Sequence, residues 1–270
     1  YYCDCTVSTP MLRGVCLAES FFRQFRWIRA AAAGVLLLAC AAFAGPVFQH
    51  ETYVWQRRWT PAVKAALAGS APRVDGWRVL AAEVDARGVF RRMAVDHNEL
   101  RRTGRPVVAV IRVDGSRLGD QAALLRDIEK TLVEWTGVAG VELDHDCPVS
   151  QLQIYREFLT QLRGRLPRST PLYITALPAW LDAPDLPDLL RTVDEAVLQV
   201  HAVMNPRRGL FEARQARTWI ERWAGLRAGG FRVALPNYGS RVTWNAAGRV
   251  TAIESEVARL GSDAGEGGRE

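Results

Sequence analysis

The chain has 270 residues, of which 49% are hydrophobic and 24% are charged, a balance typical of globular proteins. Its net charge is +6, but the sequence contains no run of five or more like charges. This pattern argues against a nucleic-acid-binding protein, which usually carries a clustered basic face. At this length the chain can form one large domain or two small ones.

The N-terminal segment, residues 1–44, has the features of an export signal. Three arginines precede the short apolar run 31–45, which contains the Ala-x-Ala cleavage site 42–44. The run is short for a membrane span. We therefore predict an exported protein of the periplasm or cell envelope. An uncleaved signal would instead attach the protein to the membrane, and the LLAC sequence that ends at Cys40 resembles a lipoprotein signal.

The cysteines of the sequence do not indicate a disulfide, a zinc site or a catalytic thiol. Of the five cysteines, only Cys147 lies beyond the predicted signal, and a lone cysteine forms no internal disulfide. The sequence has no Cys-x-x-Cys pair and no His/Cys cluster, so we do not expect a structural zinc site. The acidic neighbours of Cys147 would raise the pKa of its thiol. We interpret it as a small buried residue rather than a catalytic nucleophile.

From His50 onward, short apolar runs alternate with longer amphipathic ones. The apolar runs predict strands at residues 52–56, 77–85, 106–116, 140–148, 171–178, 195–203 and 231–239. The amphipathic runs predict helices at residues 60–69, 120–137, 150–167, 186–192 and 211–226. The repeated order of strand and helix predicts a parallel α/β fold.

Two parallel folds fit this order of elements. An open dinucleotide-binding sheet needs a Gly-rich turn after its first strand, and none follows residues 52–56. A TIM-like (β/α) barrel needs no such turn and carries its chemistry at the C-terminal ends of its strands. We therefore predict a TIM-like barrel over residues 45–256, with about seven parallel strands visible and the eighth missing or truncated. Residues 240–256 suggest a small hairpin, and residues 257–270 a disordered tail.

Polar and apolar side chains alternate in several predicted strands, so each strand has a polar and an apolar face. In the strand 140–148, the polar face carries Glu142, Asp144 and Asp146. The polar positions of the other strands are Arg112, Asp114, Tyr173, Thr175, Gln199 and His201. In a barrel the apolar face meets the helices and the other face points inward. These polar side chains should therefore converge near the C-terminal ends of the strands.

The three acids suggest glycosidic chemistry. Alternate Cα atoms of a strand lie ~6.6 Å apart, and in a poorly solvated pocket both burial and like charge raise carboxyl pKa values. At least one acid should hold a proton near neutral pH, while Arg112 and His201 keep others charged. Cleavage of a glycosidic bond requires a neutral acid beside an ionised one. A purely structural role for these acids stays open, in which they are exposed to solvent and Arg112 is an ion-pair partner. Trp180 could stack on a sugar ring or pack in the core.

Six segments together resemble the bacterial domain-of-unknown-function family 3142 (DUF3142), whose name implies no activity. They are VWQRRWTP, IRVDGS, GVELDHDCP, LYITALPAWL, LQVHAV and LPNYG. A more distant similarity is to chitinase-like glycoside hydrolases, which carry Asp-x-Asp-x-Glu at the end of the fourth barrel strand. This resemblance implies that Asp146 is the general acid and that Asp144 holds the intermediate or a substrate amide. Glu142 would then tune the pKa of its neighbour.

The chain departs from the chitinase-like pattern at two positions. Asp146 is one methylene shorter than Glu, and His201 with Ala202 stands where those enzymes carry Tyr and Asp. The similarity therefore supports the fold better than the activity, because a small displacement of a reacting group is costly. The segment LPNYGSR, with Tyr238, resembles a Tyr-Gly-Arg segment of the same enzymes.

We expect an exported, monomeric, glycoside hydrolase-like barrel that acts on or binds an envelope or extracellular polysaccharide, without a cofactor or metal. The residues expected to bind the substrate are Arg112, Asp114, Tyr173, Trp180, Gln199, His201 and Tyr238. One alternative is a non-catalytic carbohydrate-binding or scaffold barrel of a polysaccharide system, which needs no raised pKa. Another is a Mg²⁺ or Ca²⁺ site built from the same acids, although no loop of spaced ligands is evident.

Overall fold

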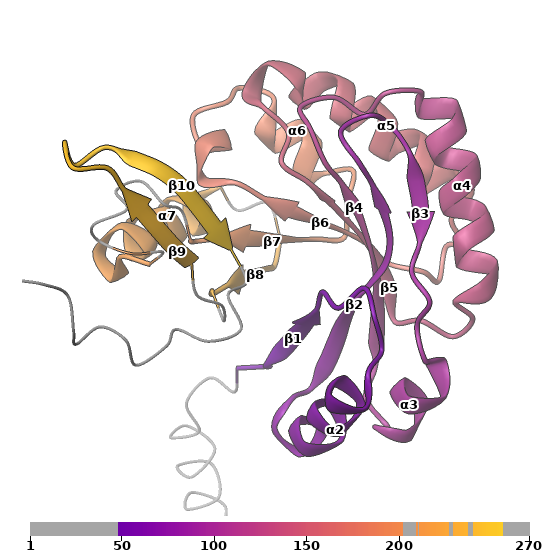
Figure 1. Cartoon of the computed structure of the whole chain (residues 1–270). Helices are drawn as coiled ribbons and strands as arrows, with labels where there is room; N and C mark the ends of the chain where they lie inside the picture. Colours follow the sequence, from indigo (N-terminus) through magenta and orange to yellow (C-terminus); the bar gives the residue numbers. More distant parts are fainter. Residues whose placement is uncertain (1–47, 202–208, 210, 227–228, 237–239, 256–270) are drawn as a thin grey trace, which may run out of the picture. The chain divides into compact units, whose positions relative to one another are not determined.

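The computed structural model describes residues 48–201, 209, 211–226, 229–236 and 240–255 (Figure 1). The export signal and the tail predicted from the sequence lie outside these residues, as does Tyr238. Within the described residues, no helix combines the length and the hydropathy needed to cross a membrane.

One large sheet organises the fold (Figure 1). Its parallel strands, in order of hydrogen bonding, are β1 (Glu51–Val54), β2 (Gly76–Val84), β4 (Val107–Val113), β5 (Gly140–His145), β6 (Leu172–Ala176), β7 (Glu195–Gln199) and β8 (Phe231–Ala234). The sheet curls into a half-barrel, and within the described residues no strand pairs between β8 and β1. The predicted TIM-like α/β barrel with seven visible parallel strands is thus confirmed.

Helices separate most of the strands. They are α2 (Pro61–Ser70), α3 (His97–Arg102), α4 (Gln121–Glu134), α5 (Leu152–Arg165), α6 (Leu186–Leu190) and α7 (Ala213–Gly225), with 3₁₀ turns η1 (Ala71–Arg73), η2 (Val149–Gln151) and η3 (Pro178–Trp180). Side chains of Thr60, Asp96 and Asp120 accept hydrogen bonds from the first turns of α2, α3 and α4, which fixes where these helices begin. Strand β3 (Phe90–Arg92), which pairs antiparallel with β2, and helix α3 were not predicted from the sequence. The predicted hairpin is present as β9 (Ser240–Trp244) and β10 (Val250–Ser255).

The hydrophobic core lies between the outer face of the sheet and the helices. Ile111 of β4 and Leu143 of β5 are fully buried together with Ile128 of α4 and Phe158 of α5. Cys147 belongs to the same core, where burial raises the pKa of its thiol to about 12. Its full burial confirms that Cys147 is a small buried residue, and its thiol is not ionised near neutral pH. Burial, rather than the acidic neighbours expected from the sequence, is what raises this pKa.

The inner face of the sheet carries a group of charged side chains that we call the interior ion cluster: Glu51, Arg78, Glu142, Glu195 and Arg232. Arg78 and Glu142 are buried, and the other three are partly exposed. Arg78 of β2 is 2% exposed and donates hydrogen bonds to Glu142 of β5 and to Glu51 of β1, the latter over 2.6 Å. Its third nitrogen lies 3.7 Å from Glu195 of β7. Arg232 of β8 donates to Glu195 over 2.6 Å and lies 3.5 Å from Glu51. The cluster therefore links five strands through side chains.

Two tyrosines complete the cluster. The hydroxyl of Tyr53 donates a hydrogen bond of 2.6 Å to Glu142, and the ring of Tyr173 lies 5.1 Å from the guanidinium carbon of Arg78. Gly140 makes room for this ring, because a Cβ atom at that position would come within 2.3 Å of it. A buried cation beside an aromatic face gains an attraction that does not require a counter-ion.

We expect Arg78→Met to lower the free energy of unfolding by about 3–5 kcal/mol, because Glu142 would be left as a buried charge without its cation. Chemical denaturation of the full chain, followed by circular dichroism, measures this loss. Arg87→Met is the matched control: the side chain of Arg87 is 81% exposed and forms a surface ion pair with Asp85, so its replacement should change stability by less than about 0.5 kcal/mol. Similar effects for the two variants would contradict a structural role for the cluster.

Candidate functional site

The C-terminal ends of four neighbouring strands bring polar side chains to Asp144 of β5. Asp144 is 1% exposed, and one of its oxygens accepts a hydrogen bond of 2.7 Å from Arg112 of β4. The other oxygen accepts from Thr175 of β6 over 2.7 Å and from Gln199 of β7 over 3.4 Å. The strand register explains this meeting, because Arg112 and Asp144 are directly paired. The convergence expected from strand alternation is therefore present around Asp144.

Arg112 connects this buried acid to two acids nearer the solvent. Its Nε donates to Asp114 over 2.8 Å, and one Nη lies 3.9 Å from Asp146. Asp146 follows the end of β5, and its side chain is 51% exposed. The site thus contains one cation among three carboxylates, of which Asp144 is buried and the other two reach water.

The electrostatics of Asp144 reflect its burial. Desolvation raises the pKa of this carboxyl above its ordinary value, while the charge of Arg112 and the hydrogen bond from Thr175 act in the opposite direction. Burial alone would lower the pKa of Arg112, but the charges of Asp144 and Asp114 raise it on balance. Arg112 therefore stays charged and holds the acids in place at any pH of interest.

The expectation of three carboxylates together in a poorly solvated pocket is wrong. Glu142 is fully buried, but its hydrogen bonds within the described residues go to Arg78 and Tyr53 in the interior ion cluster. Burial raises its pKa and the negative charge of Asp144 raises it further, while Arg78 and Tyr53 act in the opposite direction. Asp146, by contrast, is half-exposed because the strand ends before it. Alternation placed all three acids on one face, but they lie at three depths with different solvent access.

Two residues expected to bind substrate lie elsewhere. Trp180 is fully buried in the core, where its indole nitrogen donates to the backbone oxygen of Cys147 over 2.7 Å. It cannot offer a surface to a sugar in this position, so its expected stacking role is wrong. Tyr173 is half-buried beside Arg78 in the interior ion cluster and not at the strand ends.

The remaining expected residues give a mixed result. His201 follows β7 and is partly exposed, with its Nδ1 at 3.5 Å from the backbone oxygen of Ala234. Tyr238 lies outside the described residues. His145, which the sequence analysis did not select, is buried on the other face of β5 against Tyr155, and burial lowers its pKa. It belongs to the core.

The sequence analysis missed Trp55, which follows β1 directly. Its ring is parallel to that of Tyr53, with centroids 5.2 Å apart, and the guanidinium carbon of Arg112 lies 5.9 Å from the indole. A signal was present in ETYVW, residues 51–55, because alternation places Glu51, Tyr53 and Trp55 on one face. Trp55 thus belongs with the acids at the strand ends.

Metal binding finds no support in the described part of the chain, where no group of three or more His, Cys, Asp or Glu side chains is arranged to hold an ion. The carboxylates of Asp114 and Asp144 already accept hydrogen bonds from Arg112. A cation at this position would have to displace the guanidinium.

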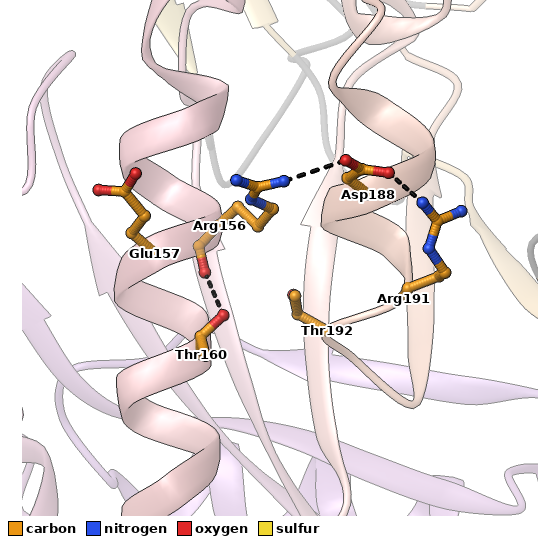
Figure 2. Close-up of a pocket in the computed structure, with 6 residues that line it drawn as sticks. All are labelled: Arg156, Glu157, Thr160, Asp188, Arg191 and Thr192. Carbon is orange, nitrogen blue, oxygen red and sulfur yellow. Dashed lines mark hydrogen bonds and ion pairs between the residues drawn. The ribbon is translucent and has the colours of Figure 1, made fainter.

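A surface cavity of about 470 Å³ lies away from these residues, between α5 and α6 (Figure 2). Its lining residues are Arg156, Glu157, Thr160, Asp188, Arg191 and Thr192. Figure 2 shows that Arg156 and Arg191 both turn to Asp188, the former over 3.1 Å. Its arginines are therefore engaged by a protein carboxylate, and none of the residues at the strand ends lines it.

The family model described as "Domain of unknown function (DUF3142)" matches residues 103–266 of the chain. No curated protein matches the chain. The predicted similarity to this family is thus confirmed over more than half of the chain, a span that contains five of the six segments; VWQRRWTP lies before it.

Solved structures share the fold at low sequence identity. The spore cortex-lytic enzyme SleL of Bacillus cereus has a TM-score of 0.62 at 14% identity, over 78% of this chain and 56% of that one. A chitinase of Bacteroides thetaiotaomicron has a TM-score of 0.59 at 11% identity, over 75% and 70% of the two chains. A chitinase of Chromobacterium violaceum has a TM-score of 0.54 at 12% identity, over 75% and 80%. These similarities establish the chitinase-like barrel fold, and the chain spans little more than half the length of SleL.

The raised pKa of Asp144 predicts a pH dependence of stability. A carboxyl whose pKa is higher in the folded chain than the unfolded value of about 3.9 binds its proton more tightly when folded. Its contribution to the free energy of unfolding therefore falls as the pH rises above about 4. Because Asn does not ionise, Asp144→Asn should gain stability relative to the wild type as the pH rises above that value.

Urea denaturation of both proteins at a series of pH values measures this difference. Thr175→Val should enlarge the pH effect on the wild-type background, since it removes a hydrogen bond that favours the charged form of Asp144. If the stability advantage of Asp144→Asn over the wild type shrinks as the pH rises, the charge of Arg112 lowers the pKa of Asp144 by more than burial raises it.

Proposed function

Because the chain belongs to the DUF3142 family, whose description assigns no activity, we propose a function from its own site. The protein is an exported, glycoside hydrolase-like barrel that cleaves glycosidic bonds in an envelope or extracellular polysaccharide. The observation that carries this proposal is the pair Asp144 and Asp146 at the end of β5, one buried and hydrogen-bonded, the other half-exposed. Glycosidases use two carboxyl groups in unlike environments at the C-terminal ends of barrel strands.

Asp146 is the general acid in this proposal. Its half-exposed carboxyl group can reach the oxygen of a bound sugar, and a polysaccharide lying over the strand ends would displace water from it. Arg112, at 3.9 Å, limits where the carboxyl group can move. The proton would move from Asp146 to the leaving oxygen as the bond between that oxygen and the anomeric carbon breaks. A water molecule would then bond to the anomeric carbon and return a proton to Asp146.

In this proposal, Asp144, which lies deeper in the barrel than Asp146, holds the substrate or its intermediate. Arg112, Thr175 and Gln199 fix its carboxylate, so it offers a constant orientation to a group inserted between the strand ends. The chitinase-like pattern of the sequence suggests an acetamido group on the sugar. Gln199, whose 3.4 Å hydrogen bond is the longest of the three, is the residue best placed to yield to such a group.

The proposed substrate class and location have separate support. Two of the similar structures are chitinases and one is a spore cortex-lytic enzyme, which favours a polysaccharide. The basic flank and Ala-x-Ala site within residues 1–44 favour export to the envelope.

A non-catalytic carbohydrate-binding or scaffold barrel is the second candidate. Both oxygens of Asp144 already have donors in Arg112 and Thr175, and Asp146 is one methylene shorter than the glutamate of the chitinase-like motif. Such a protein would bind the same polysaccharide at the same strand ends without cleaving it.

The test is hydrolysis of chitin oligosaccharides, peptidoglycan glycan strands and a panel of other polysaccharides, followed by the release of reducing ends. Asp146→Asn should lower kcat by about a hundred- to ten-thousandfold and retain affinity, since the amide keeps the shape but cannot donate the proton. Asp146→Glu should retain activity, because it restores the longer acid of the motif. Asp127→Asn is the matched control, because it makes the same acid-to-amide change on helix α4, where Asp127 pairs with Lys130; it should keep the full turnover.

The outcomes separate the candidates. Full activity of Asp146→Asn would exclude Asp146 as the acid. Binding of an oligosaccharide by the wild type without release of reducing ends, in the presence of an intact fold, would establish the binding barrel instead. Failure to bind or cleave any polysaccharide would reject both.

A further inference from the structure

Trp55 is held in place by the interior of the barrel. Val54 faces the hydrophobic core on the outer side of the sheet. Because side chains alternate along a strand, its neighbours Tyr53 and Trp55 both lie on the inner face, where their rings stack. The parallel contact with Tyr53 fixes the plane of the indole, and Tyr53 is itself fixed by its 2.6 Å hydrogen bond to Glu142. The ring is therefore ordered and partly exposed, and an ordered ring loses less entropy when a ligand binds.

The indole lies beside the acids of the candidate site. The guanidinium carbon of Arg112 is 5.9 Å from the centre of the Trp55 ring, within the range of a cation–π contact. The same guanidinium donates to Asp144 over 2.7 Å and lies 3.9 Å from Asp146. One arginine thus connects the aromatic ring with both acids.

The other tryptophans of the described residues do not combine exposure to solvent with a position beside the candidate site. Trp77, Trp135, Trp180 and Trp223 are buried in the core. Trp59 and Trp219 retain some exposure but pack against the core, and Trp244 lies on the β9–β10 hairpin. Trp55 combines partial exposure with contact to an arginine of the site.

We propose that Trp55 is a carbohydrate-stacking residue, on which a sugar ring of the polysaccharide rests next to the acids at the end of β5. The apolar C–H face of a sugar packs well on an indole, while its hydroxyl groups need polar partners at the edge. Asp114, Asp146 and Gln199 supply such partners at the neighbouring strand ends. The inference rests on the proposed function, but it holds equally for a catalytic and for a binding barrel.

The test uses the full chain and chitin hexasaccharide as the probe, with affinity measured by calorimetry and by tryptophan fluorescence. Trp55→Leu should weaken binding by about tenfold or more, and Trp55→Phe should weaken it less, because it keeps an aromatic face. With a cleaved substrate, Trp55→Leu should raise KM more than it lowers kcat, since stacking is the same in ground and transition states.

Trp244→Leu is the matched control, because Trp244 is also partly exposed but belongs to the hairpin; it should bind like the wild type. The fluorescence change on binding should persist in Trp244→Leu and be lost in Trp55→Phe. Circular dichroism establishes that each variant is folded, and Trp55→Phe preserves the contact with Tyr53 if Trp55→Leu does not fold.

Wild-type affinity and an unchanged fluorescence response in the Trp55 variants would overturn the inference and leave the proposed function intact. Absence of binding by the wild type to the hexasaccharide and to the other polysaccharides would overturn both together. The two failures are distinguishable because only the second abolishes the wild-type signal.

Discussion

The fold depends on a buried arginine. Arg78 lies inside the sheet with Glu51, Glu142 and Glu195 around its guanidinium group, and each of these glutamates comes from a different strand. Such a group is costly to desolvate, and only near-complete pairing compensates for the cost. The half-barrel therefore holds its curvature through charges that face one another across its interior, in addition to the backbone hydrogen bonds between neighbouring strands.

The candidate site repeats this arrangement nearer the solvent. Arg112 is placed among acids as Arg78 is, but it is one-third exposed and one of its partners, Asp146, reaches water. Glu142 and Asp144 are two residues apart on β5, so the rigid interior sets the position of the site above it. The difference between the two arginines is access to solvent, and that difference separates a structural cluster from a place where chemistry is possible.

Strand and helix order was enough to predict the barrel, and strand alternation was enough to predict the meeting of Arg112 with Asp144. Alternation gives the face of a residue but not its depth along the barrel. It could not show that Glu142 belongs with Arg78, a partner 64 residues away, because that contact depends on how the strands are staggered. Trp180 was misplaced for a related reason: it follows the end of β6, where a 3₁₀ turn directs it back into the core. The export signal stays a prediction.

The contact between Glu51 and Arg232 joins β1 to β8, the two edges of the sheet. Within the described residues these two edge strands share no backbone hydrogen bonds, whereas all neighbouring strands of the sheet do. Between the two edges, which form the seam of the half-barrel, the contact is made by two flexible side chains. Local opening of the barrel will begin at this seam, and amide hydrogens of β1 and β8 will exchange with solvent sooner than those of β4 and β5. The strands that carry the acids of the candidate site are the central ones, so the site lies where the sheet is expected to open last.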